Sequence, residues 1–393
     1  MKVAVDTFFL AKCFRHTGTG VYLRNLLREL LRICETNALP VEVHGFVGPD
    51  ERKWGHEGVI SPLAHWHRTG PLGFGRPWLW GGMAVRTASI RPNVVFLPTG
   101  QHTIPMPFVP VVTTILDAIP RRLPAAMGGG FGTLHVKTWI NAKLATKILT
   151  ISEWSKRDLV EIYQIEPSNI EVTYLGYDRS RYNQNPPDGE ASAGVLKKFG
   201  IDRPFIMHHG TLEVRKNITR LIQAWDRLRE QSLNYDVQLV LAGPMGHGSE
   251  EILQAREASQ HREHIFVTGA LTDDALAVLI KNASLCVIPS LYEGFCLPLI
   301  EAMACGVPTV ASNSSCIPEI SGGILEYFDP LNIDGMADSI QRALNDSELR
   351  QRLSCQGLIR AAEFTWERCA LGTLRIFEEA ALVRGSALAT PNL

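Results

Sequence analysis

Short apolar runs alternate with amphipathic helical patterns along the chain, and this alternation limits the fold more than any other feature. In the first half, runs typical of buried strands occupy Val3–Asp6, Val41–Val47, Val94–Leu97, Val111–Leu116, Lys147–Ile151 and Glu171–Tyr174. In the second half they occupy Phe205–His209, Val237–Gly243, Ile265–Gly269, Leu285–Pro289 and Thr309–Ser312, with helical patterns at 217–231, 273–282, 298–305 and 333–344. Strands that alternate with helices favour a parallel sheet covered on both faces. The pattern predicts an α/β protein.

A polar stretch that contains Pro and Gly, Asn183–Glu190, separates the two alternating halves. The chain of 393 residues is also too long for one ordinary hydrophobic core. We therefore expect one domain at 1–182 and a second at 195–365, joined by a linker at 183–194. Residues 366–393 follow as a C-terminal segment.

Composition and charge exclude several classes of protein. The chain is 45% hydrophobic and 20% charged, as in soluble globular proteins. Met1–Asp6 leads directly into a strand instead of a signal peptide, and no apolar run approaches the roughly 18 residues that span a bilayer. The eight Cys show no CxxC pair or metal-like grouping with His, so we expect reduced thiols and a cytoplasmic location.

Charge is distributed unevenly. Residues 1–180 hold 20 Lys and Arg against 14 Asp and Glu, which gives +6, and the remainder carries −7. The basic half fits an anionic partner such as a lipid diphosphate or the inner leaflet of a membrane, and ordinary solvated charge explains it almost equally well. We expect no nucleic-acid partner.

Two carboxylates stand eight positions apart at the start of one helical pattern. Glu293 lies in a Gly-containing loop, and Glu301 lies about one turn inside the helix, which begins near Pro298. The positive end of the helix dipole then lies behind four amides, those of Gly294, Phe295, Cys296 and Leu297. Amides there can bind phosphate or sugar oxygens, while the carboxylates accept hydrogen bonds from sugar hydroxyls. An acidic first turn favoured by the dipole alone is the alternative.

Two cations follow the strand Phe205–His209. Gly210 permits a tight turn, and Arg215 and Lys216 precede the next helix. Cations near a helix N-terminus are unfavourable, which favours a functional role such as binding a diphosphate at the carboxyl end of a parallel strand. Glu213 could orient them or be a plain surface residue.

The first half offers weaker candidates. Gly18 and Gly20 separate the first strand from its helix and could bring backbone close to a phosphate. Asp117 ends the strand Val111–Leu116, where it could bind substrate hydroxyls or cap the next turn.

The string Glu-Gly-Phe-x-Leu-Pro-x-x-Glu-Ala-Met-Ala-x-Gly-x-Pro-x-Val-Ala-Ser, from Glu293 to Ser312, resembles the signature of retaining GT-B glycosyltransferases of family 4. This group includes bacterial mannosyltransferases of polysaccharide assembly. Gly210–Asn217 is similar to the family element Gly-x-x-Glu-x-Arg-Lys-Asn. The resemblance implies two Rossmann-like domains that face a central cleft, with the last helix crossing back to the first domain.

The same resemblance implies the roles of individual residues. Arg215 and Lys216 would hold the donor diphosphate, Glu301 would accept from ribose hydroxyls, Glu293 would contact the transferred sugar and Asp117 would line the acceptor side. Two positions depart from the family pattern. Cys296 stands where a second Gly is usual, and Leu116 stands where a His contacts the donor sugar. His16 and His102 are candidate substitutes for that His.

We therefore expect a metal-independent retaining glycosyltransferase that needs no cofactor besides its nucleotide-sugar donor. GDP-mannose is favoured and UDP-sugars are open, while the acceptor is a glycan or a lipid-linked molecule. Retention could use a carboxylate nucleophile, or one face with the leaving phosphate as base. A catalytically silent nucleotide-sugar binder and an epimerase of the same architecture are the alternatives.

Two segments could contact a membrane surface or an acceptor. Trp66–Trp80 holds three Trp, one Phe and two Arg, and could form such a platform or be buried in the core. The basic and apolar run Lys137–Lys147 is expected to be a helix that packs on the sheet, with membrane attachment as the alternative.

Overall fold

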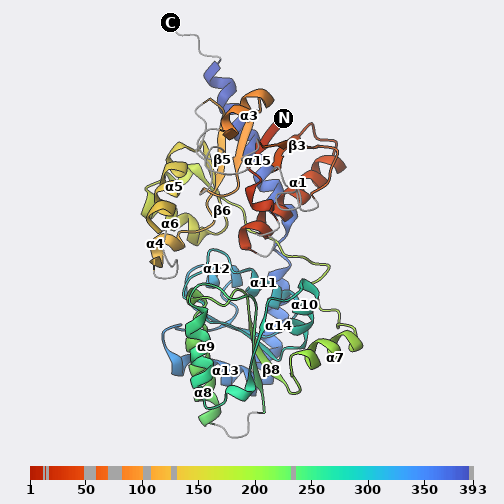
Figure 1. Cartoon of the computed structure of the whole chain (residues 1–393), viewed down its shortest axis with the longest axis vertical. Helices are drawn as coiled ribbons and strands as arrows, with labels where there is room; N and C mark the ends of the chain where they lie inside the picture. The colour runs from red at the N-terminus through yellow and green to blue at the C-terminus, as the bar shows by residue number, and fades with distance from the viewer. Residues whose placement is uncertain are drawn as a thin grey trace. The chain divides into compact units, whose positions relative to one another are not determined.

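The computed structural model describes residues 1–11, 14, 17–47, 59–69, 82–100, 108–124, 131–231 and 236–388. These residues form two compact units (Figure 1). The first unit draws on Met1–Ala118, Gly130–Gly176 and Thr365–Leu393, and the second on Ile119–Gly129 and Tyr177–Phe364. His16, His102 and the part of the aromatic segment at 70–80 lie outside the described residues.

The first unit is built on a seven-stranded parallel sheet of order β3-β2-β1-β4-β5-β6-β7. The strands are β1 (Lys2–Val5), β2 (Glu42–Val47), β3 (Ala64–Arg68), β4 (Val94–Leu97), β5 (Val111–Thr114), β6 (Lys147–Thr150) and β7 (Ile170–Val172). The helices are α1 (Gly18–Thr36), α3 (Met83–Ile90), α5 (Phe131–Leu144), α6 (Glu153–Tyr163) and α15 (Trp366–Leu388). Central strands such as β4 are buried on both faces, which explains a continuous apolar run.

The helix α1 shows why the pattern of apolar residues predicts a helix that packs on the sheet. Its apolar residues recur three and four positions apart and are buried as one stripe, with members Leu23, Leu26, Leu27, Leu30 and Leu31. The helix α15 packs beside α1 and against β4, β5 and β6 (Figure 1). Phe377 of α15 meets Phe96 of β4 edge-on, with 5.0 Å between ring centroids.

The second unit repeats the design with a six-stranded parallel sheet of order β10-β9-β8-β11-β12-β13. The strands are β8 (Phe205–His209), β9 (Gln238–Ala242), β10 (Ile265–Gly269), β11 (Leu285–Ile288), β12 (Thr309–Ser312) and β13 (Glu326–Phe328). The helices are α4 (Ile119–Arg122), α7 (Gly189–Lys198), α8 (Ile218–Gln231), α9 (Ser249–Ala258), α10 (Asp273–Asn282), α11 (Leu297–Ala304), α12 (Ile317–Ser321), α13 (Ile333–Asn345) and α14 (Ser347–Ala361).

Both sheets have the strand order of a Rossmann-like, doubly wound fold, so the α/β prediction is confirmed. The sequence patterns did not predict every described element. The strands β3 and β13 and the helices α3, α6, α9, α12 and α14 were not predicted. The helix α7 begins inside the stretch 183–194 that was expected to be a linker. Asp188 caps α7 by accepting a hydrogen bond from the amide of Ala191, and this local cap outweighs the nearby Pro and Gly.

None of the described helices is both long enough and apolar enough to cross a membrane.

Candidate active site

The candidate site lies where the strand order of the second unit changes direction. β8 and β11 are neighbours in the sheet, yet β9 and β10 extend from β8 to one side while β12 and β13 extend from β11 to the other. Loops at the carboxyl ends of two such strands diverge and leave room for a ligand. β8 leads into Gly210, and β11 leads through Pro289 toward Glu293.

The loop after β8 carries the two predicted cations in a 3-10 turn, η6 (Val214–Lys216). Gly210 has φ +126°, a backbone conformation that is strained for a residue with a side chain. Its carbonyl oxygen would lie only 1.9 Å from a Cβ on Gly243, so the two backbones approach closely here. Asn217 ties the turn to the sheet, because its amide group donates to the carbonyls of Pro289 and Pro330 at 3.0 and 2.7 Å. The cations are therefore held on a braced loop.

Glu293 joins both cations. Its carboxylate accepts hydrogen bonds from Lys216 Nζ at 2.5 Å, Arg215 Nη1 at 2.6 Å and Ser290 Oγ at 2.7 Å. Arg215 Nε also lies 2.7 Å from an oxygen of Glu213, as expected for a residue that orients this cation. We name Glu213, Arg215, Lys216 and Glu293 the charged cluster; its four formal charges sum to zero.

Two opposing effects act on Glu293. Burial alone would raise the pKa of its carboxyl, but Arg215 and Lys216 outweigh burial and lower the pKa to about 2. Glu293 is therefore ionised at neutral pH and cannot act as a general acid. It can accept hydrogen bonds or stabilise positive charge.

The predicted helix after Glu293 is confirmed as α11, which has Pro298 in its first turn. Cys296 precedes it with φ +71° and ψ 65°, a left-handed conformation that suits Gly. Phe295 turns inward and meets Phe364 edge-on at 5.6 Å. The side chains of Phe295 and Cys296 are buried, and the binding of a ligand by the amides of this loop stays a prediction. A Cβ on Gly210 would lie 3.6 Å from Pro298 and 3.7 Å from Lys216 Nζ, so α11 begins beside the cations.

Glu301 has a partner that the sequence reading missed. His209, the last residue of β8, places Nε2 at 3.1 Å from an oxygen of Glu301. A carboxylate only accepts, so the imidazole donates from Nε2. His209 Nδ1 is buried without a hydrogen-bond partner among the described residues. The sequence could have indicated His209, because it stands at the carboxyl end of a predicted strand and directly before Gly210.

Three predicted residues belong to the first unit. Asp117 lies between β5 and Ile119, at the carboxyl edge of that sheet, and is half-buried. Gly18 and Gly20 lie in the first turn of α1, where Gly20 donates its amide to Thr17 Oγ1 at 3.1 Å. A Cβ on Gly20 would fall 1.9 Å from the carbonyl oxygen of Phe14, so packing explains this glycine. The phosphate contact of the two glycines stays a prediction.

Leu116, which stands where the family has a His, is held through its backbone. Its carbonyl accepts a hydrogen bond from Ser155 Oγ at 3.0 Å, which fixes the loop before Asp117.

Comparison with known proteins identifies the domain that holds the charged cluster. Residues 196–358, which contain the whole charged cluster, match the family model of glycosyl transferases group 1. The O-antigen chain mannosyltransferase B of Escherichia coli is 32% identical over 236 residues, which cover 60% of this chain and 61% of that protein. Residues 196–358 are a glycosyl transferases group 1 domain. The chain is also 29% identical over 298 residues to the MMP alpha-(1->4)-mannosyltransferase of Mycolicibacterium hassiacum, covering 72% of the chain and 69% of the relative.

Solved structures establish the fold of the chain. The sucrose-phosphate synthase of Thermosynechococcus elongatus matches with a TM-score of 0.73 at 19% identity, covering 96% of this chain and 98% of that one. Anabaena HepE in complex with UDP and glucose matches with a TM-score of 0.72 at 15% identity, covering 96% and 100%. The fold is GT-B, with a Rossmann-like sheet in each unit, as predicted.

Proposed function

We propose that the chain is a retaining glycosyltransferase that moves a hexose, mannose favoured, from a nucleotide-diphosphate sugar to a hydroxyl of a glycan or lipid-linked acceptor. The observation that carries the proposal is the charged cluster at the carboxyl ends of β8 and β11. Two cations, Arg215 and Lys216, share one buried carboxylate there, beside the start of α11. A diphosphate is the ligand that this pair of cations suits best.

The charged cluster suggests how donor binding changes the site. Glu293 occupies hydrogen bonds of both Arg215 and Lys216, and a bound diphosphate would compete for them. As phosphate oxygens replace the carboxylate, oxygens of Glu293 become available to accept from sugar hydroxyls. The cations then neutralise charge on the leaving diphosphate, which is the role that a divalent metal has in other enzymes. This part of the proposal is metal-independent.

Glu301 and Asp117 take the remaining roles in the proposal. Glu301 accepts from the ribose hydroxyls, with its carboxylate oriented by His209. Asp117 contacts the acceptor. Retention follows either from a carboxylate nucleophile or from attack on one face, where the leaving phosphate receives the acceptor proton.

The choice of sugar rests on the relatives. Two of them carry mannosyltransferase names, and one is named for O-antigen chains, which favours GDP-mannose and an acceptor in polysaccharide assembly. HepE, whose structure holds UDP and glucose, keeps UDP-sugars as the second choice. The free cysteines among the described residues fit a reducing, cytoplasmic setting.

The first unit offers a surface for a lipid-linked acceptor. α5 buries Thr138, Asn141 and Ala142, as expected for a helix that packs on the sheet. Its other face exposes Val136, Trp139 and Leu144 beside the basic residues Lys137 and Lys143. We infer that this face touches the inner leaflet of a membrane. Trp139→Ser should weaken co-sedimentation with anionic vesicles, and Ile359→Ser, which removes an exposed apolar residue of the second unit, should not.

The function is tested with a donor panel in the presence of a chelator. GDP-mannose, UDP-glucose, UDP-GlcNAc and UDP-galactose are each scored for calorimetric binding, slow hydrolysis and transfer to a mannose-terminated acceptor. We expect one donor to bind and turn over, and Arg215→Ala and Glu301→Ala to lose both. Binding without turnover across a broad acceptor set would favour a silent binder. Interconversion of the donor sugar without acceptor would favour an epimerase.

A further inference from the structure

Three imidazoles and a carboxylate share one face at the edge of the first unit's sheet. β2 and β3 run parallel, and their register pairs His44 with His65. Because side chains alternate along a strand, Glu42 lies on the face of His44, and His67 lies on the face of His65. We name Glu42, His44, His65 and His67 the histidine cluster. It belongs to the first unit, whereas the charged cluster belongs to the second.

The atoms of the histidine cluster already approach metal-binding distances. One ligand atom from each of Glu42, His44 and His65 lies within 4.8 Å of the other two. His44 Nε2 is 3.3 Å from a Glu42 oxygen, which matches the edge of a tetrahedron, about 3.3 Å, for metal–ligand bonds of about 2.0 Å. The rings of His44 and His65 stack with 4.8 Å between centroids. Small side-chain rotations would bring all three donors onto one ion.

His67 lies next to the three donors and holds His44 in place. Its Nε2 is 3.0 Å from His44 Nδ1, on the side of the ring away from Glu42. Metal-binding imidazoles usually use their second nitrogen in such a hydrogen bond, which fixes the tautomer and the ring.

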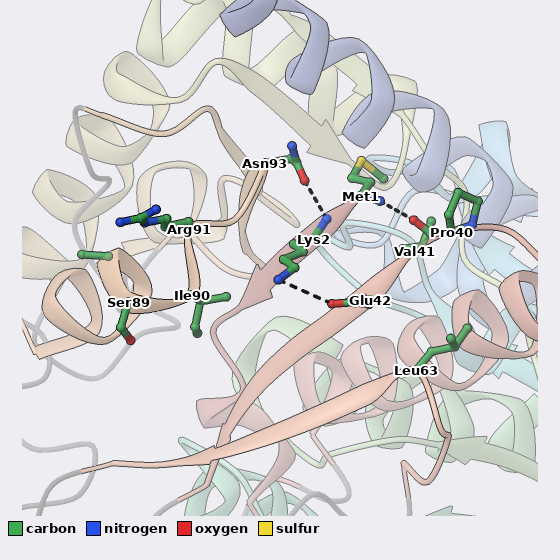
Figure 2. A pocket seen from close by; sticks show the side chains of 11 residues that line it. Met1, Lys2, Pro40, Val41, Glu42, Leu63, Ser89, Ile90, Arg91 and Asn93 are labelled. Atoms are coloured by element: carbon green, nitrogen blue, oxygen red, sulfur yellow. Dashed lines mark hydrogen bonds and ion pairs between the residues drawn. The ribbon is translucent and has the colours of Figure 1, made fainter.

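An ion can reach the histidine cluster from solvent. His44 is buried, but His65 is exposed and Glu42 is half-buried. Glu42 also lines a cavity of about 880 Å³ together with Lys2 and the end of α3 (Figure 2). The competing ion pair between Lys2 Nζ and Glu42 is 3.9 Å long and half-exposed, so it holds the carboxylate only weakly.

We propose that the histidine cluster binds one divalent transition-metal ion, with Zn²⁺ preferred, through Glu42, His44 and His65. Two imidazoles and a carboxylate suit Zn²⁺ and related ions, whereas Mg²⁺ and Ca²⁺ prefer oxygen ligands alone. The fourth position is open to water. The ion links the edge strand β3 to β2 and stabilises that edge of the sheet. The proposal is independent of the proposed donor chemistry, which uses no metal.

The test is a calorimetric titration of the full chain, without an affinity tag and after chelator treatment, with Zn²⁺ and separately with Mg²⁺. We expect one Zn²⁺ per chain, no saturable Mg²⁺ binding, and increased protection of β2 and β3 amides in hydrogen exchange. His65→Gln should weaken Zn²⁺ binding about tenfold or more, since loss of even an outer partner of a ligand costs 10–100-fold. His247→Gln, an exposed histidine of the second unit, is the matched control.

Three outcomes would overturn the proposal. These are no saturable Zn²⁺ binding, equal Zn²⁺ binding by wild type and His65→Gln, or an equal loss in His247→Gln. His65 is exposed, so its variant should fold, and circular dichroism checks this. Because binding is measured without a nucleotide sugar, the result does not depend on the proposed transferase activity.

Discussion

Replacing Glu293 by Gln should destabilise the second unit by about 3 kcal/mol at pH 7. The variant keeps the shape of the side chain but removes the charge shared by Arg215 and Lys216. The carboxyl pKa falls from 4.5 to about 2 in the folded protein, and each pH unit corresponds to about 1.4 kcal/mol. Lys216, with 5% of its side chain exposed, would remain buried without this counter-charge, and breaking a buried pair costs a similar amount.

The sign of the pH dependence follows from the lowered pKa. The unfolded carboxyl titrates near 4.5 and the folded one near 2, so the stabilisation by ionised Glu293 is fully present above about pH 5. It is lost as the pH falls from 4.5 toward 2. The difference between wild type and Glu293→Gln should shrink over the same range.

Urea unfolding of the full chain measures the effect, and hydrogen exchange in β8 and β11 assigns it to the second unit. Asp338→Asn removes an exposed carboxylate of α13 and serves as the control. Inorganic pyrophosphate should stabilise Glu293→Gln more than wild type, because its cations no longer share this carboxylate. An unfolding free energy within about 0.5 kcal/mol of wild type at pH 7, the range of ordinary surface changes, would refute the reasoning.

Three further predictions concern the same unit. Cys296→Gly should be more stable than Cys296→Ala by about 1 kcal/mol in urea unfolding. Both variants lose the thiol, but only Gly removes the strain of a side chain at φ +71°. Equal stabilities would contradict this. His209→Phe should raise the donor KM about tenfold or more, because Glu301 loses the hydrogen bond from His209. His209→Gln should bring the KM back toward the wild-type value. An unchanged KM in His209→Phe would show that Glu301 needs no such support. Burial lowers the pKa of His208 to about 3, so the wild type should lose stability as the pH falls from 6.5 toward 3. His208→Met should lose less stability over this range. Parallel stability profiles of the two proteins would contradict the prediction.

The sequence predicted those parts of the fold that local pattern determines. Buried parallel strands such as β4 and β11 are continuous apolar runs, and amphipathic helices such as α8 and α10 show clear periodicity. β3 escaped because its sequence, Ala-His-Trp-His-Arg, is polar and lies at the sheet edge, where burial on both faces is not required.

Contacts between residues far apart in the chain could not be predicted from the sequence. Arg215, Lys216 and Glu293 were each predicted, but their shared hydrogen bonds span 77 and 78 positions and follow only from the strand order. The contact between His209 and Glu301 spans 92 positions and was not predicted for the same reason. Cys296 was recognised as unusual from the sequence, whereas its left-handed conformation required the structure.

The central claim is that the charged cluster of the second unit binds the donor diphosphate. Calorimetry in the presence of a chelator tests it most directly. The affinities of GDP and GMP, and of UDP and UMP, are compared for wild type, Arg215→Ala and the exposed control Arg227→Ala. The account predicts that wild type and the control bind one diphosphate about tenfold or more tightly than its monophosphate, and that Arg215→Ala loses this preference. Equal affinity of wild type for both nucleotides, or a preference that survives in Arg215→Ala, would contradict it.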